Sequence, residues 1–345
     1  MTVFLRKTRR FGLRSRSLAI AVLLIAVVGC GTGAATPPNG APESVGSVPQ
    51  LGTFAPSTPP AASQPAPTGP ATPTAAPTPA ITANPDPNWE GTKIQFDPAN
   101  FVDPRLDTNP YHPLKPGLQW VRGGTTEVGS RVVPHEIITT MTDVIRVIAG
   151  VPTIAMLDES TDSGEVSQVG MDYLALDKDG NVWILGGYTE DYEGGAYTNI
   201  DSAWLGDGGG AAVGILSPGI VDANTPRWFI GSAPDEAASI GQPVKVGASE
   251  CVKFGCFDNV RVVQEGNIGA PDNENKSYAP GVGVINNVPL DASLHQDRFE
   301  LLNFVELSPA GLAEASQTVL DLEHHARKVA KDVYGSAPKA IRGGA

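Results

Sequence analysis

Short runs of β-branched and aromatic residues that end in Gly, Asn or Asp recur from residue 118 to residue 305, and they leave few alternatives to antiparallel strands. In the clearest case, residues 171–176 lead through Asp-Lys-Asp-Gly-Asn (177–181) into residues 182–185. An Asp-Gly pair between apolar runs favours a hairpin turn with positive φ. We therefore predict a mainly β (α+β) fold, a curved antiparallel sheet or partial barrel. Further strands are predicted at 118–122, 131–142, 144–148, 151–157, 212–216, 228–230, 243–246, 259–264, 276–279, 282–286 and 298–305.

A helical periodicity follows and predicts a helix over residues 309–334. Ser308 can cap its start, Pro309 fits the first helical position, and Gly335 favours its end. Apolar residues recur every three or four positions and form one stripe. We expect this long C-terminal helix to pack on the sheet, with a coiled-coil partner as the alternative. The stripe comprises Leu312, Ala315, Val319, Leu322, Ala326, Val329 and Val333.

Residues 1–29 have the parts of a bacterial export signal: basic residues, an apolar run over 18–28, and a small residue before Cys30. The run is shorter than the roughly 20 residues that span a bilayer, so we predict cleavage. The quartet Val-Val-Gly-Cys resembles a lipobox, in which the cysteine receives a diacylglyceryl group and an acyl chain such as palmitate. We predict lipidation of Cys30 and attachment to the extracytoplasmic side of the cell membrane. An ordinary secretory signal or an uncleaved anchor is the alternative.

Residues 30–87 are predicted to be a disordered tether behind the lipidated cysteine. The segment consists almost wholly of Pro, Ala, Thr, Gly and Ser, with Glu43 and Asp86 as its charges. This composition lacks the apolar bulk needed to offset the entropy of ordering. The chain then divides into a β-rich extracytoplasmic domain over 88–335, which includes the helix, and a flexible tail over 336–345.

The charge of the domain is strongly acidic. Setting aside the six basic residues of the signal and the two acids of the tether leaves 18 Lys and Arg against 35 Asp and Glu, a net charge of -17. Such a field repels nucleic acid, which we exclude as a partner. It also favours solubility, and it leaves open a cation or a basic partner.

Cys251 and Cys256 are the cysteines that remain after Cys30, and an exported chain meets an oxidising compartment. We predict a disulfide between them, closing a short loop that joins two strand ends. A redox-active or metal-binding thiol pair is the alternative, although the two-residue spacing typical of such pairs is missing.

Three strings resemble an uncharacterised family of exported bacterial, often actinobacterial, lipoproteins. They are Asn-Pro-Tyr-His-Pro-Leu-Lys-Pro-Gly (109–117), Asp-Lys-Asp-Gly-Asn-Val-Trp (177–183) and Tyr-Ala-Pro-Gly-Val-Gly-Val (278–284). They resemble the family patterns NPYxPLxPG, DKDGNVW and YAPGVGxV. The similarity extends over residues 101–334 and implies an exported lipoprotein, but it transfers no catalytic residue.

Candidate ion ligands are few. Asp177, Asp179 and Asn181 match the opening of a calcium loop, but the strand resumes before the further ligands such a loop requires, so a hairpin turn is the competing interpretation. Acidic groups around 158–165 and 190–193 are expected to be loop clusters at hairpin tips. The chain has no nucleophile elbow, no His-Glu-x-x-His and no phosphate loop, so we expect neither catalysis nor a cofactor.

These observations predict a membrane-anchored, non-catalytic binding or carrier module for an apolar or envelope-derived ligand. A structural or protein-interaction module of the envelope is the first alternative. A weak divalent-cation (calcium) binding domain is the second, and a hydrolase is the third. An apolar cavity would favour the carrier, a filled core the interaction module, and convergent carboxylates the cation site.

Overall fold

The computed structural model describes residues 81–83, 92–206, 211–233, 238–267, 273–291, 293 and 296–343. The predicted signal, Cys30 and most of the predicted tether lie outside the described residues. Within the predicted tether, β1 (Ile81–Ala83) is a strand that pairs with β2 (Thr92–Ile94). None of the helices in the described part of the chain combines the length and hydrophobicity needed to cross a bilayer.

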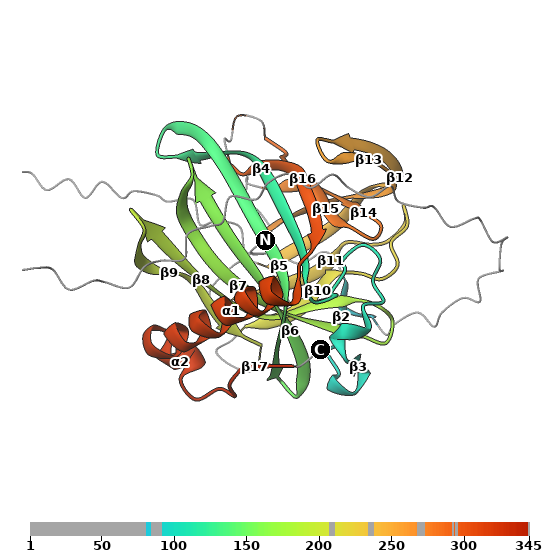
Figure 1. Ribbon diagram of the computed structural model, residues 1–345. Coiled ribbons are helices and arrows are strands. Elements are labelled where there is room, and N and C mark those ends of the chain that lie inside the picture. The colour runs from blue at the N-terminus through green and yellow to red at the C-terminus, as the bar shows by residue number, and fades with distance from the viewer. Residues whose placement is uncertain are drawn as a thin grey trace, which may run out of the picture. The chain divides into compact units, whose positions relative to one another are not determined.

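Twelve antiparallel strands of the described chain close into a barrel (Figure 1). The ring closes where β16 (Arg298–Glu306) pairs with β4 (Leu118–Val128). The predicted β class is confirmed, whereas the open or partial sheet is wrong, because closure pairs both edges that an open sheet would leave exposed. The strands between them are β5 (Arg131–Ile148), β6 (Val151–Asp162), β7 (Glu165–Asp177), β8 (Val182–Glu193), β10 (Ala212–Ser217), β11 (Trp228–Ser232), β12 (Ser239–Val252), β13 (Gly255–Asn267), β14 (Glu274–Ala279) and β15 (Gly283–Pro289).

Several strands are longer than their apolar runs predict. Residues 131–142 and 144–148 form one strand, β5, whose register shifts between Met141 and Ile145 where it pairs with β6. The strand β9 (Ala196–Leu205), rich in polar residues, was not predicted, and it extends the sheet beside β8. Main-chain pairing continues through these polar segments, where side-chain alternation carries no signal.

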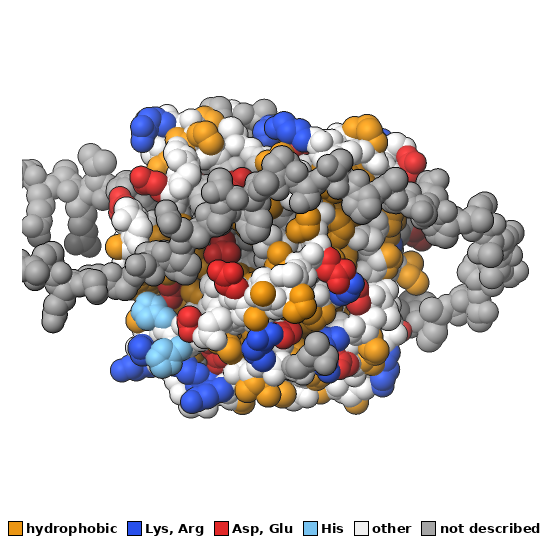
Figure 2. Space-filling model, in the orientation of Figure 1, with side chains coloured by type: hydrophobic (Ala, Val, Ile, Leu, Met, Phe, Trp, Pro, Cys, Tyr) orange, Lys and Arg blue, Asp and Glu red, His pale blue; other side chains and the backbone are white. Residues whose placement is uncertain are grey.

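The C-terminal helix packs across the outside of β5, β6 and β7 (Figure 1). It forms α1 (Pro309–Val329), and after Ala330 a short α2 (Lys331–Tyr334), so the single predicted helix is interrupted once. Ser308 Oγ accepts a hydrogen bond from Gly311 N, as its predicted capping role requires. The apolar stripe faces the sheet at Val319, Leu322 and Ala326, which are buried. On the face of the molecule that carries α1, acidic and basic side chains are interspersed (Figure 2).

The tail predicted to be flexible is held against the barrel. Its strand β17 (Ile341–Arg342) pairs with Ile145 and Val144 of β5. Arg342 Nη2 lies 2.6 Å from Asp143 Oδ2, and Ser316 Oγ donates to Asp143 Oδ1 at 2.6 Å. Burial would raise the pKa of Asp143, but these hydrogen bonds hold it below its usual value. A buried carboxylate therefore anchors the chain end, which local composition does not reveal.

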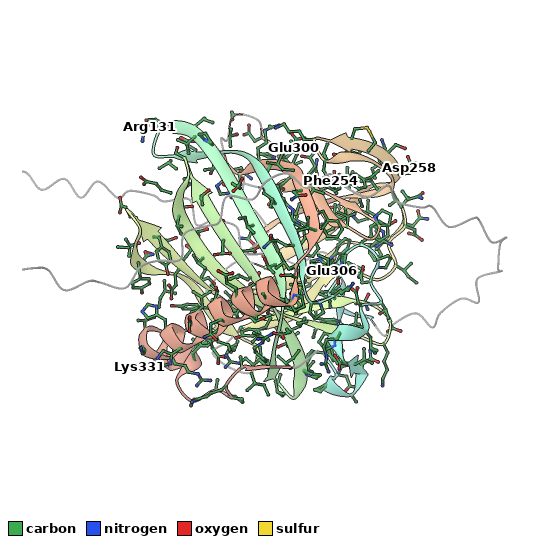
Figure 3. The ribbon with its side chains drawn as sticks, viewed as in Figure 1. Arg131, Phe254, Asp258, Glu300, Glu306 and Lys331 are labelled. Carbon is green, nitrogen blue, oxygen red and sulfur yellow. A yellow bond between two sulfur atoms is a disulfide. The ribbon has the colours of Figure 1, made fainter. Side chains whose placement is uncertain are left out.

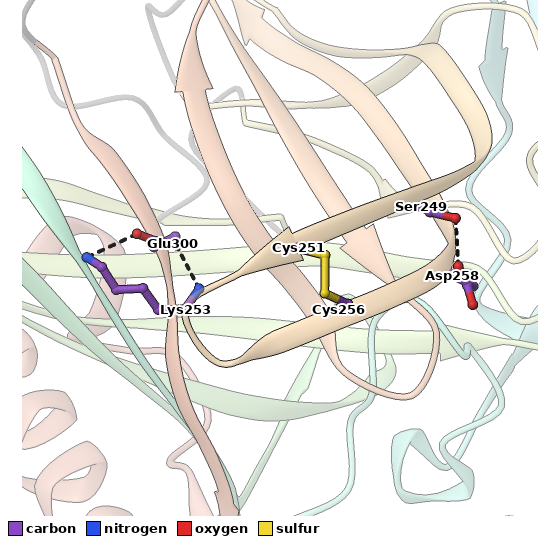
Figure 4. Close-up of a disulfide and its surroundings, with 6 residues drawn as sticks. All are labelled: Ser249, Cys251, Lys253, Cys256, Asp258 and Glu300. Atoms are coloured by element: carbon purple, nitrogen blue, oxygen red, sulfur yellow. Dashed lines mark hydrogen bonds and ion pairs between the residues drawn. A yellow bond between two sulfur atoms is a disulfide. The ribbon is translucent and has the colours of Figure 1, made fainter.

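Cys251 and Cys256 form a disulfide between opposite residues of β12 and β13 (Figure 4). The tip of this hairpin is tied to β16. Lys253 N donates to Glu300 Oε2 at 2.8 Å, and Phe254 N donates to Leu301 O at 3.1 Å. The predicted loop between two strand ends is thus present, and its tip contacts β16.

Arg342→Ala is expected to lower the free energy of unfolding at pH 7, because it removes charged hydrogen bonds from the buried carboxylate of Asp143. A lowered pKa contributes stability above the unfolded value and loses it as pH falls. The difference from the wild type should therefore shrink below about pH 4, measured by urea unfolding. Lys339→Ala, an exposed change in the same tail, is the control. An equal loss in both variants would contradict the role of Asp143.

Candidate ligand site at the plugged end of the barrel

The segment between η2 (Pro104–Leu106) and β4, residues 107–117, bonds to turns and strand ends at one end of the barrel, and we call it the plug. Asn109 Nδ2 donates to Gly180 O at 2.9 Å in the β7–β8 turn and to Ser217 O at 3.0 Å at the end of β10. Gly281 N, in the β14–β15 turn, donates to Pro110 O at 2.6 Å. The three motifs noted in the sequence, which lie up to 170 residues apart, therefore meet at this end.

The plug is held by its own hydrogen bonds as well. Asp107 Oδ1 accepts a hydrogen bond from Leu114 N at 2.5 Å, and Asn109 Oδ1 accepts from Tyr111 N at 2.9 Å. The Tyr111 hydroxyl donates to Asn259 O at 2.8 Å, and the Arg261 guanidinium lies 3.5 Å from the centre of the Tyr111 ring. The loop is thus a fixed wall for the space behind it.

A cavity lies behind the plug, inside the barrel and not beneath α1. About 40 Å³ of it is open to the centres of water molecules. Its wall comes from strands on several sides of the ring and is amphipathic. The apolar part comprises Trp120, Met141, Met156, Leu216, Val282 and Val284. The polar part comprises His112, Arg122, Thr139, Glu265, Lys276 and Tyr278.

Arg122 is a buried cation on this wall. Its Nε donates to Val284 O at 2.9 Å and its Nη1 donates to Thr139 Oγ1 at 2.8 Å. The guanidinium carbon lies 5.7 Å from the centre of the Trp120 ring. Among the described residues no carboxylate forms an ion pair with it, and burial lowers the pKa of Arg122 to about 9. It remains a cation at neutral pH.

Lys276 is a second buried cation, and it is neutralised. Its Nζ lies 2.8 Å from Glu265 Oε2 and 2.9 Å from Glu274 Oε1. Tyr278 also donates its hydroxyl to Glu265, and Asn287 Nδ2 donates to Glu274 Oε2 at 2.7 Å. Burial alone would lower the pKa of Lys276, but the two carboxylates outweigh burial and raise it. The cluster is closed on itself.

His112 brings an unused position to the cavity. Its Nδ1 is buried and has no hydrogen-bond partner among the described residues. Burial lowers the pKa of His112 to about 3, and the positive charges of Arg122 and Lys276 act in the same direction. The ring is therefore neutral at physiological pH.

The candidate calcium ligands form the β7–β8 turn. Asp177 Oδ1 accepts from Asp179 N at 3.0 Å and from Asn181 N at 2.8 Å. Its Oδ2 accepts from Asn181 Nδ2 and from Trp183 Nε1, both at 2.8 Å. Gly180 has a φ of +78°, as the Asp-Gly pair predicts. Within the described chain no group of three or more His, Cys, Asp or Glu is arranged to hold a metal ion.

The expectation that the acidic groups around 158–165 and 190–193 are loop clusters is wrong for several members. Asp158 and Glu190 are buried within β6 and β8. Glu190 accepts hydrogen bonds from the hydroxyls of Tyr188 and Tyr192, both at 2.7 Å, and its Oε1 lies 2.5 Å from His325 Nδ1 on α1. These carboxylates are buried because β6 and β8 are longer than predicted, and Glu190 links β8 to α1.

The polar wall of the cavity was not predicted from the sequence. The available signal was alternation, since Trp120 and Arg122 share one face of a strand, as do Lys276 and Tyr278. A charged residue at such a position usually faces solvent, and only the register of the closed ring places these inside.

No protein-family model matches this chain, and a search of curated proteins finds no match. A crystal structure of a protein described as a "putative lipoprotein" from Parabacteroides distasonis ATCC 8503 is similar at 11% sequence identity, with a TM-score of 0.30. The match covers 57% of this chain and 99% of that one.

Asn109→Ala should loosen the plug, because it leaves the carbonyls of Gly180 and Ser217 without their donor. We expect a loss of about 2–4 kcal/mol in the free energy of unfolding and faster amide exchange in residues 107–117. Thr108→Ala, at the exposed neighbouring position, is the control for hydrogen exchange measured by mass spectrometry. Unchanged exchange in Asn109→Ala would contradict the plug.

Lys276→Met should destabilise the barrel by about 3–5 kcal/mol at pH 7, because it leaves the buried carboxylates of Glu265 and Glu274 without a cation. The folded pKa of these carboxyls then exceeds the unfolded value, so the variant regains stability as pH falls toward 5. Chemical denaturation across this pH range measures the effect. Lys276→Met combined with Glu274→Gln should lose less, whereas a loss independent of pH would rule out the electrostatic cause.

Proposed function

We propose that this chain is a lipid-anchored extracytoplasmic protein that binds a small ligand inside its barrel without transforming it. The lipobox-like quartet that ends at Cys30, together with the three motifs that resemble those of exported lipoproteins, supports the location. The amphipathic cavity, with its buried Arg122 guanidinium and the unused Nδ1 of His112, is the observation that carries the binding role.

The size of the cavity restricts the ligand. A water molecule needs about 10–15 Å³ of such space, so 40 Å³ holds about three. Pockets for drug-sized ligands are about 300–1,000 Å³. The proposed ligand is therefore a small molecule available at the envelope. This restricts the class of apolar or envelope-derived ligands expected from the sequence to small ones and disfavours a lipid chain.

The chemistry of the wall supports binding more than turnover. The Thr139 hydroxyl accepts from Arg122 and donates to Asp158 Oδ1 at 2.5 Å, and the Tyr278 hydroxyl donates to Glu265. These hydroxyls are fixed by neighbouring charges. A nucleophile must reach its substrate with a base beside it, whereas these groups are committed to one another.

Native mass spectrometry tests the proposal on the full chain purified from the membranes of its own host, before and after organic extraction. We expect extraction to remove a small non-covalent mass, while a covalent lipid on Cys30 stays attached. A chain that carries no such mass, and gains none from extracts of its host, would contradict ligand binding and favour an interaction module of the envelope.

Variants of the cavity wall provide the control. Leu216→Trp, which fills the cavity, should abolish the bound mass and keep the β circular dichroism of the wild type. Met141→Leu conserves volume on the same wall and should retain the mass, with a stability change below about 1.5 kcal/mol. Loss of the ligand from both variants or from neither would place the ligand elsewhere.

A further inference from the structure

The buried cations of the barrel differ in their partners. Arg146 Nη1 lies 3.1 Å from Glu323 Oε1, and Lys276 contacts two glutamates. Arg261 donates to the carbonyls of Pro218 and Gly219, both at 3.2 Å, and it does not line this cavity. Arg122 combines a position on the cavity wall with the lack of an ion-pair partner among the described residues. A buried charge without a counter-ion is unfavourable, so this position favours an anion.

One edge of the Arg122 guanidinium is available. Nε and Nη1 are bound to Val284 O and Thr139 Oγ1, whereas no described residue accepts a hydrogen bond from Nη2. His112 lines the same cavity, and its buried Nδ1 has no hydrogen-bond partner among the described residues. A neutral imidazole with its proton on Nδ1 is a donor. Two donors from opposite sides, the plug and β4, thus serve one small space.

The neighbouring charges select a monoanion. Lys276 contacts both Glu265 and Glu274, so the cluster carries one excess negative charge when both carboxylates are ionised, and Arg122 is the cation on the cavity wall without an ion-pair partner among the described residues. A phosphate dianion would meet two carboxylates with one guanidinium to balance it, whereas a carboxylate brings one charge and a geometry that guanidinium matches.

The remaining wall specifies the body of the ligand. Met141, Met156 and Leu216 face the cavity and offer no hydrogen bonds beyond weak sulfur contacts. The space of about three waters corresponds to about 90 Å³ of liquid, enough for a carboxylate on a short aliphatic chain.

Resting on the proposed function, we propose that the cavity binds a short-chain monocarboxylate. Its carboxylate accepts hydrogen bonds from Arg122 Nη2 and His112 Nδ1, and its aliphatic chain lies against Met141, Met156 and Leu216. The plug residue His112 thereby contacts the ligand directly, which links the first sequence motif to recognition.

Isothermal titration of the full chain in detergent with acetate, propionate and butyrate, each beside its neutral amide and beside inorganic phosphate, tests the ligand class. We expect an acid of this series to bind about 30-fold or more tightly than its amide, since the charged contact is lost in the amide. Equal affinity for acid and amide, or a preference for phosphate, would overturn the inference.

Arg122→Met should weaken binding of the preferred acid by about 30-fold or more. Arg131→Met makes the same change at the outer end of the β4–β5 hairpin (Figure 3) and should bind as the wild type does. Arg122→Lys keeps the charge without the forked donors and should lie between them. Circular dichroism checks that each variant is folded, and retained binding in a folded Arg122→Met would overturn the inference.

The two proposals fail separately. If native mass spectrometry finds a bound mass that is neutral, or one that Arg122→Met retains, the carboxylate is excluded while the barrel remains a binding protein. If neither a bound mass nor binding of any tested acid is found, both proposals are excluded.

Discussion

Closure of the ring between β4 and β16 is the constraint on which the rest of the structure depends. An eight-stranded barrel is just wide enough for its own side chains to fill, and twelve strands enclose more space. Large and polar side chains fill much of it here, including Trp120, Arg122, Tyr278 and Lys276. Because an unpaired buried charge is unfavourable, Lys276 is held between Glu265 and Glu274. The plug then covers one end.

Much of the fold could be predicted from local patterns. Alternating apolar runs located most strands, the Asp-Gly pair located the β7–β8 turn, and capping residues located the start of α1. Closure could not be predicted, because the pairing of β4 with β16 joins residues far apart in sequence and leaves no local signal. The pairing of the tail with β5 could not be predicted for the same reason, since Asp143 lies on β5.

The candidate site was less predictable than the fold. Its three motifs were visible as strings, but their meeting at one end of the barrel depends on register around the whole ring. Arg122 and Lys276 resemble the solvent-facing charges of an ordinary strand until the ring is closed. The same ambiguity explains Asp158 and Glu190. Composition predicts that they lie in loops, whereas they lie in long strands that bury them. Buried charge is a property of topology here, not of local sequence.

The pairing of the first ring strand with the last also imposes an order on folding. The hairpins from β4 to β8 join strands that are neighbours in the sequence, whereas the β4–β16 pairing joins Leu118 to the distant Glu306. Contacts between such distant residues slow folding because loop entropy is lost before the contact forms. Until β16 pairs with β4, the ring is an open sheet with two unpaired edges.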